Sequence, residues 1–283
     1  MQPTRSNTRR FSQPRRLGFA FNLRKAVFVL PNLFTLSSVF CGFYAILLAG
    51  DSPGPDELYR ASLAIFFGVF FDMADGRVAR LTRTQSDFGV QLDSLADQVT
   101  FGVAPGVVLY QWALRPFGLA GAAVACIYVC CGAMRLARFN VLASRAPGPM
   151  KYFIGVPIPT AATVLLSLVM FHQRTYAEPP HSTWSILALV LVVSYLMISN
   201  VRYRSFKDLK PSKLSLTILC ALLVLFGTLS VLVKPTFALA LFAWGYLTFG
   251  MLEEVIFYRR RRREESQRAA APSVPTQPTQ DKP

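Results

Sequence analysis

Long apolar runs recur along nearly the whole chain, and they constrain its fold more than any other feature. Of the 283 residues, 53% are hydrophobic and only 16% are charged, whereas about a quarter of the residues in a soluble domain are charged. The runs are long enough to cross a bilayer as helices. They predict an all-α, polytopic integral membrane protein with about eight transmembrane helices, at 27–49, 59–80, 87–114, 117–140, 155–172, 183–199, 214–232 and 235–257.

The basic residues predict how these helices are oriented. If the N-terminus is cytoplasmic and eight helices alternate in direction, 26 of the 30 Lys and Arg residues lie on the cytoplasmic side. Cytoplasmic loops of membrane proteins carry such an excess. We therefore expect a multi-pass protein of the cell (inner) membrane with both termini in the cytoplasm. The net charge of +15 then reflects topology, so no nucleic-acid partner is expected.

Five aspartates stand in a short window that follows the apolar run 63–71. Asp72 and Asp75 are three residues apart, and Asp93 and Asp97 are four apart, so each pair shares one face of a helix. Two antiparallel helices joined by a short polar turn, at about 81–87, would aim all four carboxylates at one point. Carboxylates inside a membrane span are costly and are therefore expected to serve a function.

A divalent cation would relieve the repulsion between these four carboxylates. Hard oxygen ligands favour Mg²⁺, Mn²⁺ or Ca²⁺, and two ions suit four carboxylates. The alternative, in which Asp72 and Asp75 end a helix and pair with Arg77 and Arg80, explains single acids but not the whole set. Gly76, Gly89 and Ala79 would leave room for a ligand beside the acids, and Arg80 can bind a phosphate. The window thus predicts a pocket for a metal-bound diphosphate.

The pattern D72-x2-D75-G76-x2-A79-R80-x8-G89-x3-D93-x3-D97 resembles the signature of the CDP-alcohol phosphotransferase family at every fixed position. The resemblance implies a metal-dependent membrane enzyme, with Mg²⁺ or Mn²⁺ as cofactor, in which an alcohol displaces CMP from a CDP-linked substrate. It also implies that the four aspartates hold the metals and that Asp97 is the general base. The residues implied to bind the CDP-linked substrate are Gly76, Ala79, Arg80, Ser86 and Gly89, with Asn32 and Thr35 of the motif PNLFT (31–35) as weaker candidates.

Within this family, the chain most resembles the phosphatidylserine synthase branch. The resemblance lies in 31–45, 92–105, 131–141 and 157–162, and Ser94 and Gln98 replace the Pro and Lys that are usual in phosphatidylglycerophosphate synthases. It implies transfer of the phosphatidyl group of CDP-diacylglycerol to L-serine, in a homodimer. In RLARFN (135–140), Arg135, Arg138 and Asn140 are candidates to bind the acceptor or a phosphate. Glycerol 3-phosphate, an inositol compound or choline remains the alternative acceptor.

The chain divides into four expected parts: a basic cytoplasmic segment (1–25), a catalytic membrane core (26–172), additional transmembrane helices (173–257), and a basic then disordered tail (258–283). The tail is polar and rich in proline, which is typical of disorder. A transporter or ion channel is the alternative class of function. It would place acids near the middle of the bilayer, often in two repeats, whereas this chain has one cluster beside cytoplasmic arginines.

Overall fold

The computed structural model describes residues 23–82, 86–145, 152–176, 180, 183–200, 202–204, 241, 244 and 245. Within these residues the fold is helical, as expected, apart from one small sheet. Strands β1 (Tyr152–Ile154) and β2 (Arg202–Arg204) pair antiparallel there. The α-helices are α1 (Leu23–Leu48), α2 (Pro55–Thr82), α3 (Asp87–Asp97), α4 (Ala104–Leu109), α5 (Leu119–Arg145), α6 (Ile158–Thr175) and α7 (Thr183–Ile198).

The first six expected helices all coincide with helical parts of the structure. The last two, 214–232 and 235–257, lie outside the described residues except at 241, 244 and 245, where the chain is helical. The tail 258–283 and nearly all of the basic segment 1–25 also lie outside them. The count of eight helices and the side on which the termini lie therefore stay predictions.

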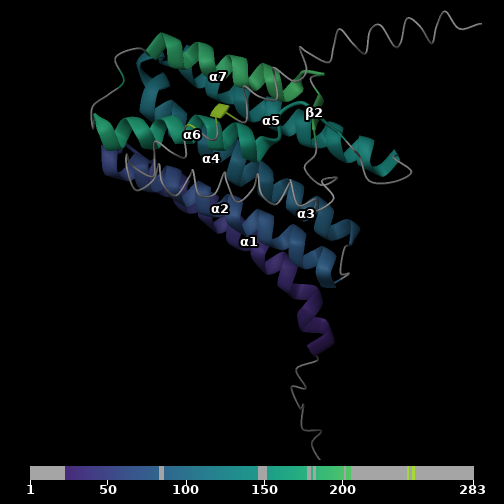
Figure 1. Cartoon of the computed structure of the whole chain (residues 1–283). Coiled ribbons are helices and arrows are strands. Elements are labelled where there is room, and N and C mark those ends of the chain that lie inside the picture. Colours follow the sequence, from purple (N-terminus) through teal and green to yellow (C-terminus); the bar gives the residue numbers. More distant parts are fainter. Residues whose placement is uncertain are drawn as a thin grey trace, which may run out of the picture.

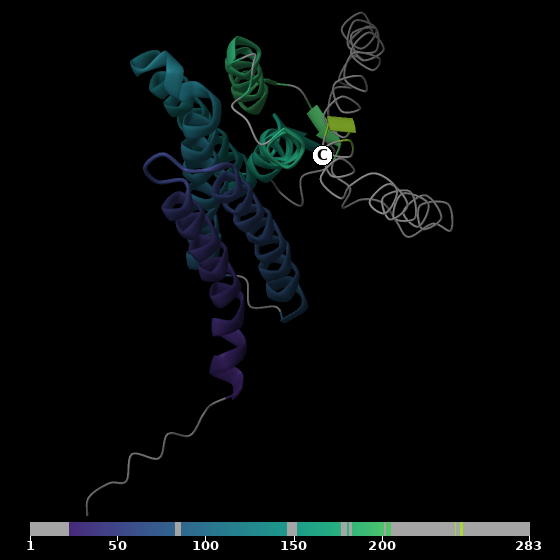
Figure 2. The same cartoon turned by 90° about the vertical axis from the view of Figure 1, so that its left-hand side faces the viewer.

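Helices α1 and α2 run side by side along most of their length, and they form one side of the molecule (Figures 1 and 2). Helix α2 begins with Pro55, whose fixed φ suits the first helical position. Acids in its first turn and Arg80 in its last turn complement the helix dipole. Helix α6 packs on α2, α3 packs on α1, and α7 packs on α5. The site described below lies where α1, α2 and α3 meet.

The expected helix 87–114 is continuous but is not a regular α-helix. Two π-helical segments, η1 (Gln98–Val103) and η2 (Tyr110–Leu114), flank α4, and a 3₁₀ turn, η3 (Arg115–Phe117), follows. Pro105 has no N–H, so it cannot donate to the carbonyl of Phe101 four residues earlier. The hydroxyl of Tyr128 in α5 donates to that carbonyl instead, at 2.8 Å. The carbonyl of Phe101, in the irregular part of the helix, therefore has a hydrogen-bond donor inside the core.

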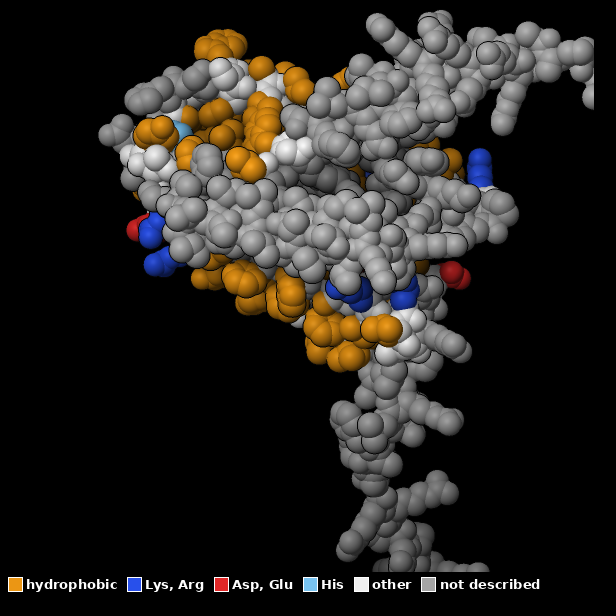
Figure 3. Space-filling view, viewed as in Figure 1, with side chains coloured by type: hydrophobic (Ala, Val, Ile, Leu, Met, Phe, Trp, Pro, Cys, Tyr) orange, Lys and Arg blue, Asp and Glu red, His pale blue; other side chains and the backbone are white. Residues whose placement is uncertain are grey.

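The surface of the helices fits a membrane protein. Two helices of the described part are long and apolar enough to cross a bilayer, Leu30–Leu48 and Leu119–Arg145. Large apolar side chains on α1 are also exposed, among them Leu33, Phe40 and Leu47. Figure 3 shows a band of apolar side chains along the edge that α1 and α2 form in Figure 1. Because water does not favour such a band, we treat the chain as a membrane protein.

Candidate active site

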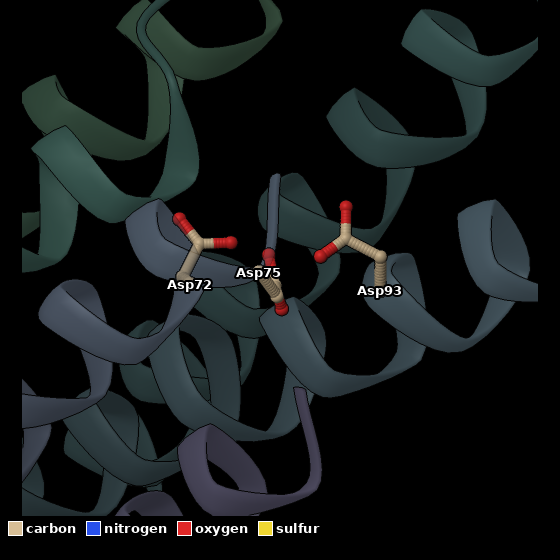
Figure 4. Close-up of side chains that lie close together, drawn as sticks. All are labelled: Asp72, Asp75 and Asp93. Carbon is tan, nitrogen blue, oxygen red and sulfur yellow. The ribbon is translucent and has the colours of Figure 1, made fainter. Parts of the chain in front are cut away.

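Three carboxylates from two helices meet at the cluster that the sequence predicted. Asp72 and Asp75 lie in the last three turns of α2, and Asp93 lies in the middle of α3. One oxygen atom from each of the three lies within 4.8 Å of the others. In Figure 4 the side chains of Asp72 and Asp93 point toward each other from opposite sides of Asp75. Asp75 is buried.

Asp97 occupies the last position of α3, directly before the π-helical segment η1. Its carboxyl group lies within hydrogen-bonding reach of the carboxyl group of Asp72. It also lies close enough to Arg135 of α5 for an electrostatic interaction. Two carboxyl groups in contact repel each other unless a proton or a cation lies between them. Asp97 thus joins the group of acids through Asp72.

Two of the carboxylates, those of Asp75 and Asp93, border a cavity of about 240 Å³ between α1, α2 and α3. The signature positions Gly76 and Ala79 line it, and so do Ser86 and Gly89. A Cβ atom at Gly76 would meet no atom within 4 Å, so this glycine faces open space. The other lining residues are Pro31, Asn32, Thr35, Asp75, Val90 and Asp93. Most residues expected to bind the CDP-linked substrate therefore surround one space.

Thr35 links the first helix to the acidic cluster. Its hydroxyl lies 2.7 Å from Oδ2 of Asp75 and 3.1 Å from the carbonyl of Pro31. A hydroxyl has only one proton to donate. Of the two oxygen atoms, the carboxylate oxygen is both closer and the stronger acceptor. Thr35 therefore donates to Asp75 and orients its carboxylate from the cavity wall.

Ser86 has a structural partner as well as a place in the cavity wall. It is the N-cap of α3, where its hydroxyl accepts a hydrogen bond from the backbone N–H of Gly89 at 3.1 Å. Asp87 stands in the first turn, where a negative charge suits the helix dipole. These two residues start α3 at the position that turns Asp93 toward α2.

The remaining candidates lie outside the cavity wall. Arg80 is exposed and does not line the cavity. Arg138 donates to the carbonyls of Ile198 and Ser199, at 2.8 and 3.2 Å, and so caps the end of α7. Asn140 donates to the hydroxyl of Ser94 at 2.9 Å and joins α5 to α3. The structure thus gives Arg138 and Asn140 partners within the protein.

Arg135 differs from these because it is buried next to the acids. Its side chain is 7% exposed, and its guanidinium lies 5.4 Å from the ring centre of Phe139. Its Nε atom is buried and has no hydrogen-bond partner among the residues that the structure describes. Buried polar groups almost always have a partner, so this donor is free to serve a bound molecule near Asp97.

Two of the lining residues, Pro31 and Val90, were not among the predicted candidates. Pro31 begins the quoted motif PNLFT, and Val90 lies three residues before Asp93 on α3. The helical spacing of 86, 89, 90 and 93 places all four positions on one face. The same periodicity that selected the aspartates would therefore have found Val90.

The donor set of this site suits a divalent cation. The candidate ligand atoms of Asp72, Asp75 and Asp93 are all carboxylate oxygens, which Mg²⁺ and Mn²⁺ prefer. The acids lie at the end of an apolar helix, where their mutual repulsion is weakly screened. A bound cation would offset that repulsion, so the residues present fit the metal that the signature implies.

The comparison with known families gives the class of this protein. Residues 28–197 match the model of the CDP-alcohol phosphatidyltransferase family. The match covers more than half of the chain and includes every candidate residue from Asn32 to Asn140. The chain therefore belongs to the CDP-alcohol phosphatidyltransferase family, whose members generally depend on a divalent metal.

Individual relatives narrow the comparison further. The chain is 37% identical over 230 residues to the CDP-diacylglycerol–serine O-phosphatidyltransferase of Helicobacter pylori (strain J99), covering 81% of this chain and 92% of the relative. The enzyme of the same name from Bacillus subtilis is 37% identical, covering 63% and 91%. That from Methanocaldococcus jannaschii is 34% identical, covering 78% and 92%.

Proposed function

We propose that this protein transfers the phosphatidyl group of CDP-diacylglycerol to the hydroxyl of L-serine, which yields phosphatidylserine and CMP. The observation that carries the proposal is the group of carboxylates from α2 and α3 at the wall of a cavity of about 240 Å³. Five of the eight signature residues line this cavity, namely Asp75, Gly76, Ala79, Gly89 and Asp93. The relatives named above carry this activity in their names.

Asp72, Asp75, Asp93 and Asp97 are the proposed metal ligands, for two ions of Mg²⁺ or Mn²⁺. When bound, such ions act as Lewis acids that stabilise negative charge on the diphosphate. Thr35 keeps the carboxylate of Asp75 oriented toward the site through its 2.7 Å hydrogen bond. A ligand that is held by a second residue binds its ion more tightly than a mobile one.

Asp97 is the proposed general base. Its carboxylate takes the proton of the serine hydroxyl as the hydroxyl oxygen attacks the phosphorus that is bonded to diacylglycerol. A new oxygen–phosphorus bond forms, and the bond from that phosphorus to the bridging oxygen of CMP breaks. CMP leaves to the aqueous side, and phosphatidylserine stays in the membrane. Arg135 lies beside Asp97 and balances its negative charge before the proton arrives.

The CDP group is proposed to occupy the cavity itself. Gly76, Ala79 and Gly89 leave the space, because longer side chains there would fill it. Asn32, Thr35 and Ser86 supply polar groups along the wall. Arg80 is exposed near the same end of α2, from where its guanidinium can reach a phosphate at the mouth of the cavity.

For the acceptor, Arg135, Arg138 and Asn140 are the proposed binding residues, and Arg135 is the strongest of them. Its buried Nε has no hydrogen-bond partner in the described part of the chain, whereas the other two side chains already hold α7 and α3. A serine carboxylate needs a cationic partner, which an inositol or a glycerol hydroxyl does not. The position of Arg135 next to Asp97 would bring the serine hydroxyl close to the base.

We infer the same membrane arrangement that the sequence predicts. The protein crosses the cell (inner) membrane eight times, and its termini and active site face the cytoplasm. Residues 26–172 form the catalytic core and 173–257 add further helices, between the basic segment 1–25 and the tail 258–283. The enzyme acts as a homodimer.

A substrate comparison tests the function. Purified protein receives CDP-diacylglycerol and Mn²⁺ or Mg²⁺, with labelled serine, glycerol 3-phosphate, inositol and choline offered separately. We expect CMP release and a labelled lipid with serine alone, and no turnover after the metal is removed with EDTA. Turnover with another acceptor and none with serine would refute the proposal and show that the protein is a sister synthase that uses that acceptor.

A further inference from the structure

Three helices meet at a polar contact one turn deeper in the bundle than the carboxylates. Ser38 of α1, Gly68 of α2 and Thr100 of η1 form this contact. Each of them lies about one helical turn from a residue of the site, namely Thr35, Asp72 and Asp97 respectively. The contact therefore lies directly beneath the cluster and joins the same three segments that carry it.

Hydrogen bonds hold this contact together. The hydroxyl of Thr100 donates to the carbonyl of Ser38 at 2.9 Å, and the hydroxyl of Ser38 donates to the carbonyl of Gly68 at 3.2 Å. The two hydroxyl oxygens are 3.4 Å apart. Thr100 is 0% exposed and Ser38 is 2% exposed. Because no water competes inside a membrane protein's core, these bonds keep a fixed set of partners.

The backbones of α1, α2 and η1 pack closely at the same point. A Cβ atom at Gly68 would lie 2.6 Å from the methyl carbon Cγ2 of Thr100. A Cβ atom at Gly42 of α1 would lie 2.7 Å from Cα of Thr100. Non-bonded contacts this short are essentially never seen for a Cβ atom, so a side chain at either glycine requires Thr100 or the helix that faces it to move. The two glycines thus set how closely η1 approaches α1 and α2.

We propose that this joint, made of Ser38, Gly42, Gly68 and Thr100, sets the separation between the carboxylates of α2 and those of α3, and that Thr100 is a positioning residue for the metal cluster. Segment η1 begins directly after Asp97, so a shift of Thr100 moves the acidic end of α3. The proposal rests on the proposed function for its turnover readout. Its metal-binding readout does not depend on which acceptor the enzyme uses.

The size of the expected effect follows from metal sites in general. Changing residues that orient metal ligands typically costs about 10–100-fold in metal affinity or activity. Displacements of about 1 Å far from the reacting atoms can cost about 10²-fold in rate. An added methyl group at this joint would force a displacement on that scale, because the clash involves tightly packed helices.

The test is a pair of glycine variants combined with Thr100→Ser. Gly68→Ala clashes with the methyl group of Thr100, which Thr100→Ser removes, and the next atom, Oγ of Ser38, is at an ordinary 3.5 Å. Gly42→Ala clashes with the backbone of Thr100, which no side-chain change removes. Mn²⁺ binding to the purified protein without substrate is measured by electron paramagnetic resonance, together with thermal unfolding.

We expect Gly68→Ala to weaken Mn²⁺ binding by about 10-fold or more, and the double variant with Thr100→Ser to bind Mn²⁺ about as tightly as Thr100→Ser alone. Gly42→Ala stays weak with or without Thr100→Ser. Wild-type Mn²⁺ binding by Gly68→Ala, or a double variant no tighter than Gly68→Ala, would overturn the proposal. Turnover with serine is followed in parallel. A wild-type protein that binds Mn²⁺ but does not use serine would refute the proposed function. The Mn²⁺ comparison between the variants would still decide the proposal about the joint.

A second comparison covers the case in which the alanine variants do not fold. Thr100→Val keeps the size of the side chain and removes the hydroxyl. Thr163→Val makes the same change in α6, where the hydroxyl donates at 2.7 Å to the carbonyl of Pro159 in its own helix. We expect several-fold weaker Mn²⁺ binding for Thr100→Val only. An equal effect of the two valines would show that Thr100 acts on stability alone and would contradict the positioning role.

Discussion

At the scale of single residues, the spacing of the aspartates carried most of the information about the site. Pairs three and four residues apart share a helix face whatever the neighbouring helices do. The structure brings Asp72, Asp75 and Asp93 within 4.8 Å of one another. The same reasoning applied to Arg135 and Arg138 did not separate their environments, because burial depends on which helices cover α5. One of the two lies beside Asp97, and the other holds the end of α7.

Asp97→Asn tests the general base. The amide keeps the size of the side chain but cannot take the serine proton, so we expect turnover to fall by about 10²–10⁴-fold. Binding of the CDP-linked substrate should be largely kept, since the cavity wall is unchanged. CMP release and binding of labelled CDP-diacylglycerol are measured. Asp87→Asn, at an exposed position outside the signature, is the control, and near-normal activity of Asp97→Asn would refute the assignment.

Arg135→Gln and Arg138→Gln should affect different properties. Loss of the buried cation beside Asp97 is expected to raise the KM for serine at least about tenfold, because its carboxylate loses a charged hydrogen bond. Loss of the cap on α7 is expected to lower the thermal unfolding temperature instead. Steady-state kinetics with varied serine, and unfolding in detergent, separate the two. A KM effect confined to Arg138→Gln would reverse the assignment.

At the scale of elements, the helix that carries Asp93 and Asp97 shows how a simple hydropathy pattern hides backbone detail. The run 87–114 predicts one helix, and the structure has one continuous helix with π-helical segments inside it. Pro105 marks the place, since it has no N–H to donate to the carbonyl of Phe101 four residues earlier. The sequence does not say that Tyr128, in another helix, would supply the donor.

Tyr128→Phe tests that element. Removing the hydroxyl leaves the buried carbonyl of Phe101 without its donor, which typically costs about 1–3 kcal/mol. We expect a lower unfolding temperature of the purified protein, measured by calorimetry or by a fluorescence melt. Tyr195→Phe, on an exposed position of α7, serves as the matched control. If both variants unfold at the wild-type temperature, Tyr128 does not stabilise η1.

At the scale of the whole molecule, the arrangement of the helices serves a substrate that stays in the membrane. Apolar faces of α1 are exposed over much of their length, and the cavity opens near one end of α1, α2 and α3. In the proposed reaction, acyl chains stay among lipids while the diphosphate reaches the carboxylates at the membrane edge. The excess of Lys and Arg in alternate loops predicts that this edge faces the cytoplasm.

Reporter fusions test this topology. With eight helices and a cytoplasmic start, a reporter that is active only in the cytoplasm should work when fused to either terminus. The same reporter inserted at 50–54 or 177–182, in loops predicted to face outward, should be silent there, and a periplasmic reporter should be active. Termini on opposite sides would show that the number of spans is odd and would refute the count.

The sequence by itself determined the class of protein, six of its helices, and most of the residues that line the cavity. Hydropathy and helical periodicity gave the helices and the acidic pairs, because they act over a few turns and need no knowledge of the neighbouring segments. Asn32, Thr35 and Ser86 were implied by the resemblance to the family. Only the tertiary structure decided that Asp97 contacts Asp72, that Arg138 caps α7, and that Ser38, Gly68 and Thr100 meet beneath the cluster. These contacts join residues far apart in the chain, so they depend on how closely the helices pack and at what register.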